Sequence, residues 1–325
     1  MEQSGMMFDL NLGSSFSEKK DLYEILIIGG GPAGLTAGIY GSRSKRDTLI
    51  IEKLLPGGQV GLTDIVENYP GFPEGIEGPE LVKKMEAQAK KFGTEIITDE
   101  IIDLKLEEEE KEVISRSGSY RTKTIIIASG ATQRKLGVPG EKEFTGRGVS
   151  YCATCDGAFF EGQEIAVVGG GDTAVQEAIY LTQFAKKVTI IHRRDKLRAS
   201  KILQERAFKN EKIDFLWDSV VTEIMGDKRV EKIKVKNVKR GEEKIIEKNG
   251  IFIYIGLVPN TSYLKGKIKL DQNGYVITDE NMRTSIEGVY AAGDVRTKSL
   301  RQIVTATADG AQAAMSAVEY LEERD

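Results

Sequence analysis

The chain has 325 residues, of which 40% are hydrophobic and 30% charged, a balance that predicts two folded domains rather than a disordered polymer. Its 46 basic and 50 acidic residues give a formal net charge of -4, so no basic surplus favours nucleic acid or an anionic membrane as a partner. No apolar run reaches the roughly 20 residues that a membrane helix needs, and residues 1–20 lack the pattern of a signal peptide. We therefore expect a cytoplasmic protein with a protein or small-molecule partner, and an N-terminal extension over residues 1–20.

The first predicted unit is a strand, a glycine loop and a helix. Residues 24–28 form a short apolar run typical of a buried parallel strand, and residues 34–44 continue with helical spacing. A second strand over residues 49–52 ends in Glu52, where a ribose diol needs an acceptor. Glycines in the loop let a pyrophosphate approach the helix N-terminus, which predicts a dinucleotide site, with an unliganded turn as the alternative. The loop reads Gly29-Gly30-Gly31-Pro32-Ala33-Gly34.

The segment that follows predicts a helix and a set of strands. The helix spans Pro79 to Phe92 and ends at Gly93, which is a common C-cap residue. Strands are expected around residues 94–106 and 120–128. The intervening run Glu107–Glu110 suits a solvated hairpin tip, with an acidic docking patch as the alternative.

The only two cysteines are Cys152 and Cys155. A disulfide between them closes too small a loop to stabilise the fold much, so in a reducing compartment the pair indicates redox chemistry. A structural zinc site is disfavoured, because zinc takes about four ligands and His192 is the only histidine. We expect no metal. The pair is predicted to open a helical turn, a position that lowers the pKa of a thiol.

A second strand, glycine loop and helix follows over residues 164–182 and predicts a second dinucleotide. Its next strand, residues 187–191, ends in a basic cluster and carries no carboxylate where the first unit has Glu52. Guanidinium groups bind a 2′-phosphate that a carboxylate would repel, so NADPH is favoured over NADH. A solvated basic turn is the alternative. The loop reads Gly169-Gly170-Gly171-Asp172-Thr173-Ala174, and the basic cluster comprises His192, Arg193, Arg194 and Arg198.

Two glycine- and proline-bearing stretches, Gly130–Gly140 and Gly256–Asn260, flank the second unit and predict that it is inserted into the first through two connectors. The fold class is therefore α/β, with two doubly wound Rossmann-like domains and a discontinuous first domain. The expected boundaries are an extension at 1–20, an FAD-binding domain at 21–132 and 261–325, and an NADPH-binding domain at 133–260 with the cysteine pair.

After the second connector, a buried strand is predicted to end in Gly293 and Asp294. This segment resembles the one with which flavoproteins bind the ribityl chain, which favours FAD at the first loop. A helix is expected to begin with Arg301-Gln302-Ile303 and to run to about Leu321. Its positive N-terminus, if turned to the isoalloxazine ring, would stabilise the anionic reduced flavin by about 0.3–2 kcal/mol. Simple packing of this small-residue helix on a sheet is compatible with that role.

The segment Ser150–Gly157 resembles the redox centre of low-molecular-weight thioredoxin reductases, which are class II pyridine nucleotide-disulphide oxidoreductases. The resemblance extends from about residue 22 to the end, and includes Pro56–Gln59, Val66–Gly71, the turn His192–Asp195 and Gly293-Asp294. The motifs and the resemblance together give candidate FAD contacts at Gly29, Gly31, Pro32, Ala33, Gly34, Glu52, Gly58, Gln59, Asn68, Gly130, Gly293, Asp294, Arg301, Gln302 and Ile303. The candidate NADPH contacts are Gly169, Gly171, Asp172, Thr173, His192, Arg193, Arg194 and Arg198.

The resemblance implies that Cys155 faces the flavin, that Cys152 attacks the partner's disulfide and that Asp156 acts as acid or base. A helix-capping or structural role for Asp156 is the alternative. The resemblance also implies a homodimer, thioredoxin or a thioredoxin-like protein as partner, and a rotation of the domains about the two connectors.

The sequence departs from the family at Leu257, where members often carry a histidine, and this disfavours a role for an imidazole near that connector. An NADPH–ferredoxin reductase of similar fold is the nearest rival function, but it would not need Cys152 and Cys155. The flavoprotein component of a hydroperoxide reductase would need a further dithiol domain, for which residues 1–20 are too short. A redox-sensing flavoprotein is the non-enzymatic alternative, and it would not need an NADPH site.

Overall fold

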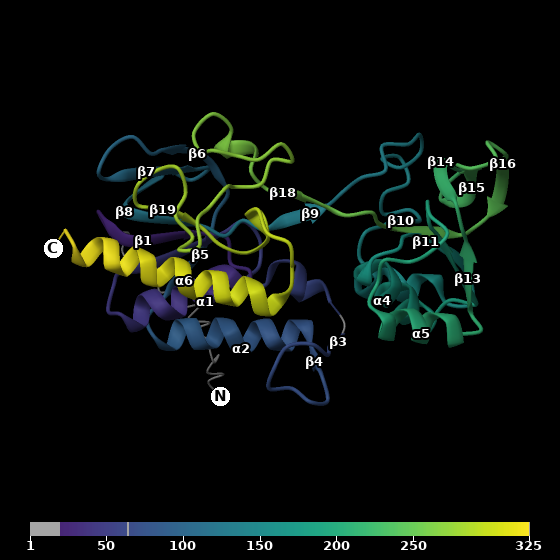
Figure 1. Cartoon of the computed structure of the whole chain (residues 1–325), viewed down its shortest axis with the longest axis horizontal. Coiled ribbons are helices and arrows are strands. Elements are labelled where there is room, and N and C mark those ends of the chain that lie inside the picture. The colour runs from purple at the N-terminus through teal and green to yellow at the C-terminus, as the bar shows by residue number, and fades with distance from the viewer. Residues whose placement is uncertain (1–19, 64, 325) are drawn as a thin grey trace, which may run out of the picture.

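The computed structural model describes residues 20–63 and 65–324, which form two α/β units side by side, joined by a two-stranded connection (Figure 1). The sheet of the first unit has the strand order β5-β2-β1-β8-β7-β6, with β19 also paired to β8. The neighbours β5, β2, β1, β8 and β19 run parallel, whereas β6, β7 and β8 form an antiparallel meander. The strands are β1 (Tyr23–Ile28), β2 (Thr48–Glu52), β5 (Glu95–Thr98), β6 (Ile101–Lys105), β7 (Lys111–Ser115), β8 (Ser119–Ile127) and β19 (Val289–Ala291).

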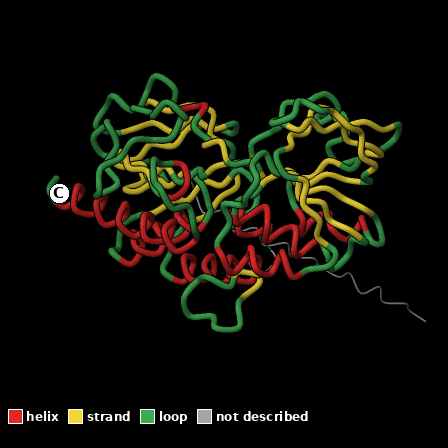
Figure 2. Tube along the Cα trace, turned by 45° about the vertical axis from the view of Figure 1, so that its right-hand side comes forward, coloured by secondary structure: helices red, strands yellow, loops and turns green. Residues whose placement is uncertain are grey.

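Three helices pack on this sheet: α1 (Pro32–Arg43), α2 (Gly78–Lys91) and α6 (Ile303–Glu322). Figure 2 shows the helices of both units gathered along the same side of the sheets. One apolar core lies between the sheet and these helices, and a second lies on the opposite face under residues 264–295. The first unit also contains a short helix η1 (Gly58–Leu62) and a small hairpin of β3 (Ile65–Val66) and β4 (Ile76–Glu77).

The second unit contains a five-stranded parallel sheet of order β10-β17-β11-β12-β13. Its strands are β10 (Val149–Ser150), β11 (Glu164–Gly169), β12 (Lys187–Ile191), β13 (Ile213–Leu216) and β17 (Gly250–Tyr254). The helices are α3 (Ala153–Asp156), α4 (Asp172–Leu181) and α5 (Lys201–Lys209). An antiparallel meander of β14 (Ser219–Gly226), β15 (Val230–Asn237) and β16 (Glu243–Glu247) packs beside it.

The two units share one topological feature. In the first, β1 lies between β2 and β8, and in the second, β11 lies between β12 and β17. Because the chain leaves each central strand toward one side and later returns on the other, a crevice forms at the carboxyl ends of the strands. The glycine loops follow β1 and β11 at that edge, so the fold places both predicted dinucleotide loops where such ligands bind.

The connection between the units is an antiparallel pair of β9 (Ala131–Gln133) and β18 (Leu257–Pro259). Asn260 fastens the pair at its end, because its amide Nδ2 donates to the Ser129 carbonyl at 2.8 Å and its backbone N–H donates to the Gly130 carbonyl at 3.0 Å. The two connectors therefore run together as one ribbon.

Most predicted elements are present with small shifts of their ends. The helix after residue 78 ends at Lys91, with Gly93 in the left-handed region at φ 98°, and the Glu107–Glu110 run joins β6 to β7 as a hairpin tip. One start was wrong: α6 begins at Ile303 rather than Arg301, because Gln302 is its N-cap and forms a capping box with Thr305. The expected extension over residues 1–20 lies outside the described residues except for its last residue.

Candidate active site

The two cysteines form a disulfide at the start of α3, in a helical turn as the sequence predicted. Cys152 is the N-cap residue, and its Sγ accepts a hydrogen bond from the Cys155 backbone N–H at 3.1 Å. An N–H aimed at sulfur stabilises a thiolate, so in the reduced protein this contact favours ionisation of Cys152. The Ser150 hydroxyl accepts from the Cys152 N–H at 3.0 Å and fixes the approach to the turn.

Asp156 ends α3, one residue beyond Cys155. It is partly exposed, and within the described residues its side chain makes no capping hydrogen bond to the η2 segment (Gly157–Phe160) that follows. The geometry therefore offers no capping contact for the alternative role of Asp156, and leaves its carboxylate beside the disulfide turn.

A hollow of about 620 Å³ is lined by Ser150 and Asp156, which flank the disulfide turn in sequence. It reaches from Ser150 and Asp156 to Phe159, whose side chain is 76% exposed, and to Arg147 and Arg229 on the far wall. An exposed aromatic side chain at the edge of such a hollow is a feature of protein-binding surfaces. Sequence reasoning did not single out Phe159, although the Phe-Phe pair after the cysteine motif was a visible signal.

The candidate FAD residues converge on the first glycine loop. The Glu52 carboxylate at the end of β2 accepts from the Gly30 N–H at 2.6 Å, and the Gly57 N–H donates to the Gly30 carbonyl at 2.8 Å, which holds the start of η1, with Gly58 and Gln59, against the loop. The side chains of Asn68 and Gln302, 234 residues apart in sequence, meet at 2.9 Å. Gly130 lies where the chain leaves the sheet for the connection, and Pro32, Ala33 and Gly34 open α1.

Close packing explains the last glycine of this loop. A Cβ on Gly34 would lie 1.9 Å from the Gly29 carbonyl oxygen, so only glycine permits α1 to approach β1 this closely. Gly31 is different, because no other described atom lies within 4 Å of the Cβ it would carry. The loop is packed on one side and open on the other, as a pyrophosphate cradle must be.

Two polar atoms at this site lack protein partners. Asp294 Oδ1 and Arg301 Nε are buried, and neither has a hydrogen-bond partner in the part of the chain that the structure describes. Burial, with a smaller contribution from the charge of Asp309, raises the pKa of Asp294 above its ordinary value, and the ammonium of Lys298 and the guanidinium of Arg301 offset only part of that rise. Buried polar groups are rarely left unpaired, so a carboxylate without a donor fits a ligand rich in hydroxyls. The residues present fit FAD.

The candidate NADPH residues also converge. The His192 ring at the end of β12 is buried under the second glycine loop, where a Cβ on Gly170 would lie 2.4 Å from it. Burial, followed by the charges of Arg198, Arg194 and Arg193, lowers the pKa of His192 and favours the neutral ring. The Arg198 N–H donates to the Gly170 carbonyl at 2.7 Å, which ties the basic cluster to the loop.

Arg193, Arg194 and Arg198 are exposed, and none forms an ion pair with another of the described residues. Nearby carboxylates are bound elsewhere: Asp195 and Asp218 both pair with Lys239 at 3.0 Å. Asp172, a candidate ligand, instead accepts from the Ser200 N–H at 2.6 Å and orders the segment before α5, while Thr173 is exposed. The guanidinium groups are thus available for a phosphate.

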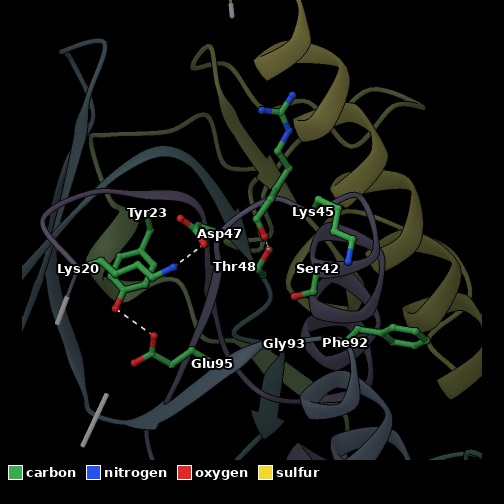
Figure 3. A pocket seen from close by; sticks show the side chains of 10 residues that line it. Lys20, Tyr23, Ser42, Lys45, Asp47, Thr48, Phe92, Gly93 and Glu95 are labelled. Carbon is green, nitrogen blue, oxygen red and sulfur yellow. Dashed lines mark hydrogen bonds and ion pairs between the residues drawn. The ribbon is translucent and has the colours of Figure 1, made fainter. Parts of the chain in front are cut away.

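A smaller hollow of about 220 Å³ lies at the opposite edge of the first sheet, at the amino ends of β1 and β2 (Figure 3). Tyr23 donates to Glu95 at 3.2 Å there, and burial together with the charge of Glu95 raises the pKa of Tyr23 to about 12. Several polar groups of this hollow pair with one another, and the length of β1 separates the hollow from the first glycine loop.

Within residues 20–63 and 65–324, no group of three or more His, Cys, Asp or Glu side chains is arranged to hold a metal ion. In the same part of the chain no helix is both long and apolar enough to cross a membrane.

Comparison with known proteins identifies this arrangement. The family model for pyridine nucleotide-disulphide oxidoreductases matches residues 23–310. A thioredoxin reductase of Peptoclostridium acidaminophilum is 52% identical over 309 residues, which cover 93% of this chain and 98% of that protein. A thioredoxin reductase of Bacillus subtilis is 53% identical over 308 residues, covering 94% and 97% of the two chains.

Solved structures agree. A crystal structure of Lactococcus lactis thioredoxin reductase in the FR conformation is 51% identical and superposes with a TM-score of 0.91 over 93% of this chain and 99% of that one. The thioredoxin reductase of Streptococcus pyogenes is 53% identical over similar shares, 93% and 99%, yet gives a TM-score of 0.63. Thioredoxin reductases of this family use FAD and NADPH. The chain belongs to the pyridine nucleotide-disulphide oxidoreductase family, and within it to the thioredoxin reductases of low molecular weight.

Proposed function

We propose that this chain reduces thioredoxin or a thioredoxin-like protein with electrons from NADPH, which pass through FAD and the Cys152–Cys155 disulfide. The observation that carries the proposal is the disulfide at the start of α3, in the same unit as a glycine loop with unpaired arginines and beside a unit that fits FAD. When bound, FAD supplies a relay between a two-electron hydride donor and a disulfide.

Cys152 is the nucleophile in this proposal. With both cysteines reduced, the Cys152 thiolate attacks the partner's disulfide, forms a mixed disulfide and releases one partner thiolate, which takes a proton from Asp156. Asp156, left ionised by that transfer, takes the proton of the Cys155 thiol. The Cys155 thiolate then attacks Cys152 Sγ, re-forms the internal disulfide and releases the second partner thiolate, which takes up a proton from the solvent. The N–H of Cys155 that points at Cys152 Sγ at 3.1 Å supports this order.

Trapping the mixed disulfide tests these roles. Reduced Cys155→Ser protein should form a stable covalent adduct with an oxidised, activated thioredoxin variant that keeps only its attacked cysteine, because neither protein then holds a thiol that can resolve the adduct, while Cys152→Ser should form far less. Non-reducing electrophoresis and mass spectrometry measure the adduct. The opposite pattern, with the adduct on Cys155, would reverse the assignment.

We place the partner's docking site at the hollow beside the disulfide. Phe159 offers an exposed aromatic surface in the same hollow as Ser150 and Asp156, which flank the cysteine turn, and a partner whose own disulfide meets Cys152 would cover it. Removing this surface with Phe159→Ala should raise the KM for thioredoxin about 10-fold or more. Turnover with a small disulfide should change little, and an equal loss with both substrates would remove Phe159 from the docking site.

We further propose that the second unit rotates relative to the first, because both the nicotinamide and the disulfide of the second unit must reach the flavin held by the first. Three contacts between the units hold the present arrangement. Cys152 Sγ lies 3.9 Å from the Leu62 carbonyl, Gln176 donates to the Ile65 carbonyl at 3.3 Å, and Glu67 pairs with Arg206 at 2.8 Å. The two solved relatives support rotation, because their identities of 51% and 53% are alike while their TM-scores are 0.91 and 0.63. A different placement of otherwise similar units produces such a difference.

We further propose that the domains follow the boundaries expected from the sequence, that the chain forms a homodimer and that it works in the cytoplasm without a membrane or nucleic-acid partner. Family membership supports these points. Sedimentation of the FAD-loaded protein tests the dimer, and a single species with the mass of one chain at micromolar concentration would contradict it.

A further inference from the structure

A buried cluster of charges joins α6 to the turn that follows β19. Asp309, which is 7% exposed, lies in the second turn of α6. Its Oδ2 accepts hydrogen bonds from the Gly293 N–H at 3.0 Å, from Arg296 Nε at 2.9 Å and from Lys298 Nζ at 2.8 Å, and its Oδ1 accepts from Arg296 Nη2 at 3.2 Å. One carboxylate therefore fixes both ends of the segment from residue 293 to residue 298.

The backbone of the same turn and of α6 packs closely against the start of α1. Gly293 has φ 80°, in the left-handed region that favours glycine, and a Cβ there would lie 2.9 Å from the Ala33 Cβ. A Cβ on Gly310, the neighbour of Asp309, would lie 2.1 Å from the Ala33 carbonyl oxygen. The turn therefore packs directly on the backbone at the start of α1, and the hydrogen bonds of Asp309 add side-chain contacts to the backbone bonds that hold it, such as that from the Ala292 N–H to the Ile127 carbonyl at 2.9 Å.

The cluster also acts on the unpaired carboxylate of the site. The Lys298 side chain is only 8% exposed and is anchored by Asp309. Burial raises the pKa of Asp294, the charges of Lys298 and Arg301 oppose that rise, and the charge of Asp309 adds to it. Burial would also raise the pKa of Asp309, but the hydrogen bonds from Arg296 and Lys298 hold it below its ordinary value. Asp309 therefore stays charged and keeps the Lys298 ammonium in place.

We propose that Asp309 is a positioning residue for FAD: it fixes the Gly293 turn and the Lys298 ammonium, and through them it holds Asp294 in place to accept hydrogen bonds from the hydroxyls of the ribityl chain. The inference rests on the proposed flavin function. Asp309 itself lies behind the turn and does not need to touch the ligand.

The test compares the release of FAD from loaded full-length proteins. Wild type, Asp309→Asn and Lys298→Met are diluted serially, and the dissociation constant is obtained from the rise in flavin fluorescence. Asp309→Asn should bind FAD about 10- to 100-fold more weakly, as expected for the loss of charge-assisted hydrogen bonds. Lys298→Met should show a smaller loss, and it provides the test if Asp309→Asn does not fold.

Asp279→Asn is the matched control. Asp279 lies in the same unit and its Oδ1 accepts from the Arg283 N–H at 2.8 Å and the Asn281 N–H at 3.0 Å, but it is exposed and belongs to another turn. Its substitution removes one structural carboxylate of the same kind, and we expect a change in FAD affinity of less than about 3-fold.

A pH profile separates positioning from general loosening of the fold. Without Lys298, only Arg301 still opposes the rise in the pKa of Asp294 that burial and the charge of Asp309 cause, so Asp294 takes up a proton at a higher pH. The FAD affinity of Lys298→Met should therefore fall, as pH is lowered, at a pH where the wild type is still unaffected. Lys298→Arg should restore the wild-type profile. A parallel loss at every pH, without rescue, would reduce the cluster to a purely structural role.

The outcomes for the two proposals differ. If wild-type protein retains no FAD at micromolar concentration, the proposed flavin function fails. If wild type binds FAD tightly and both variants bind it equally well, only the role of Asp309 is overturned.

Discussion

The two glycine loops have the same fold but opposite electrostatic surroundings. In the first, β2 ends in Glu52, whose carboxylate accepts the Gly30 N–H at 2.6 Å. In the second, β12 is followed directly by His192, whose neutral ring fills the space under Gly170, and exposed arginines come next. The comparison teaches that topology fixes where a dinucleotide binds, while the residue at the end of the second strand selects which one.

The largest effect is expected from substitutions that add a Cβ to the first glycine loop. Gly34→Ala places a Cβ 1.9 Å from a backbone oxygen, and we expect it to cost about 3 kcal/mol or more in the free energy of unfolding. Gly31→Ala is the matched control, because its Cβ meets no other described atom within 4 Å, so the stability without FAD should change by less than about 1 kcal/mol. Chemical denaturation measures both, and equal destabilisation would show that the loop is not packed on one side only.

The cluster of Asp309, Arg296 and Lys298 lies beside the first glycine loop, and the described residues hold no counterpart of it at the second loop. The pH dependence of its contribution to stability is therefore a test that applies to the first unit alone. Because the pKa of Asp309 is lowered in the folded protein, its stabilisation is present above the ordinary carboxyl pKa and is lost as pH falls through the lower folded value. Asp309→Asn should be about 3 kcal/mol less stable than wild type near pH 7, since it leaves buried cations unpaired. The gap should narrow below about pH 4 in urea titrations. A gap independent of pH would contradict this reading.

The basic cluster should discriminate between the two nicotinamide cofactors. Arg193→Ala removes a guanidinium from the end of β12, and the KM for NADPH should rise about 10- to 100-fold because a charge-assisted bond to the 2′-phosphate is lost. The KM for NADH should change less than about 3-fold, as should FAD content. Steady-state kinetics with both cofactors measure the split. An equal rise for both would mean that Arg193 contacts a part the two cofactors share, and no change for either would make the cluster a solvated turn.

The smallest effect is expected where the two units touch. Glu67 and Arg206 are 60% and 46% exposed, so their ion pair contributes at most about 1 kcal/mol, or about 5-fold in the balance between domain arrangements. Arg206→Met should therefore shift that balance only slightly, measured by the rate at which a cross-linker joins the units, and more at low salt than at high salt. A shift of 100-fold would mean that this pair, rather than the sum of weak contacts, controls the arrangement.

Local patterns predicted most of the fold. Both strand–loop–helix units, the hairpin tip at Glu107–Glu110 and the helical turn of the cysteines were predictable, because each depends on short-range periodicity or glycine placement. The start of α6 was missed by two residues because glutamine is not a typical N-cap residue, and only the capping box reveals its role.

The charge cluster and the docking hollow could not be predicted. Asp309 reads as an ordinary polar position of a helix, and its contact with Gly293 depends on how α6 crosses the sheet. Phe159 reads as one of two adjacent aromatic residues, and only the packing shows that Phe160 is buried while Phe159 is exposed. Such differences arise from long-range packing, which sequence periodicity does not contain.

The most direct test of the account is NADPH oxidation by the FAD-loaded protein with oxidised thioredoxin, in wild type and in Cys152→Ser. The account predicts rapid turnover in the wild type and a loss of at least about 1,000-fold in the variant, with flavin retained, because nucleophile variants lose activity on this scale or more. Turnover that survives in Cys152→Ser, or that proceeds equally fast without thioredoxin, would contradict the dithiol route and favour direct electron transfer from the flavin to another acceptor.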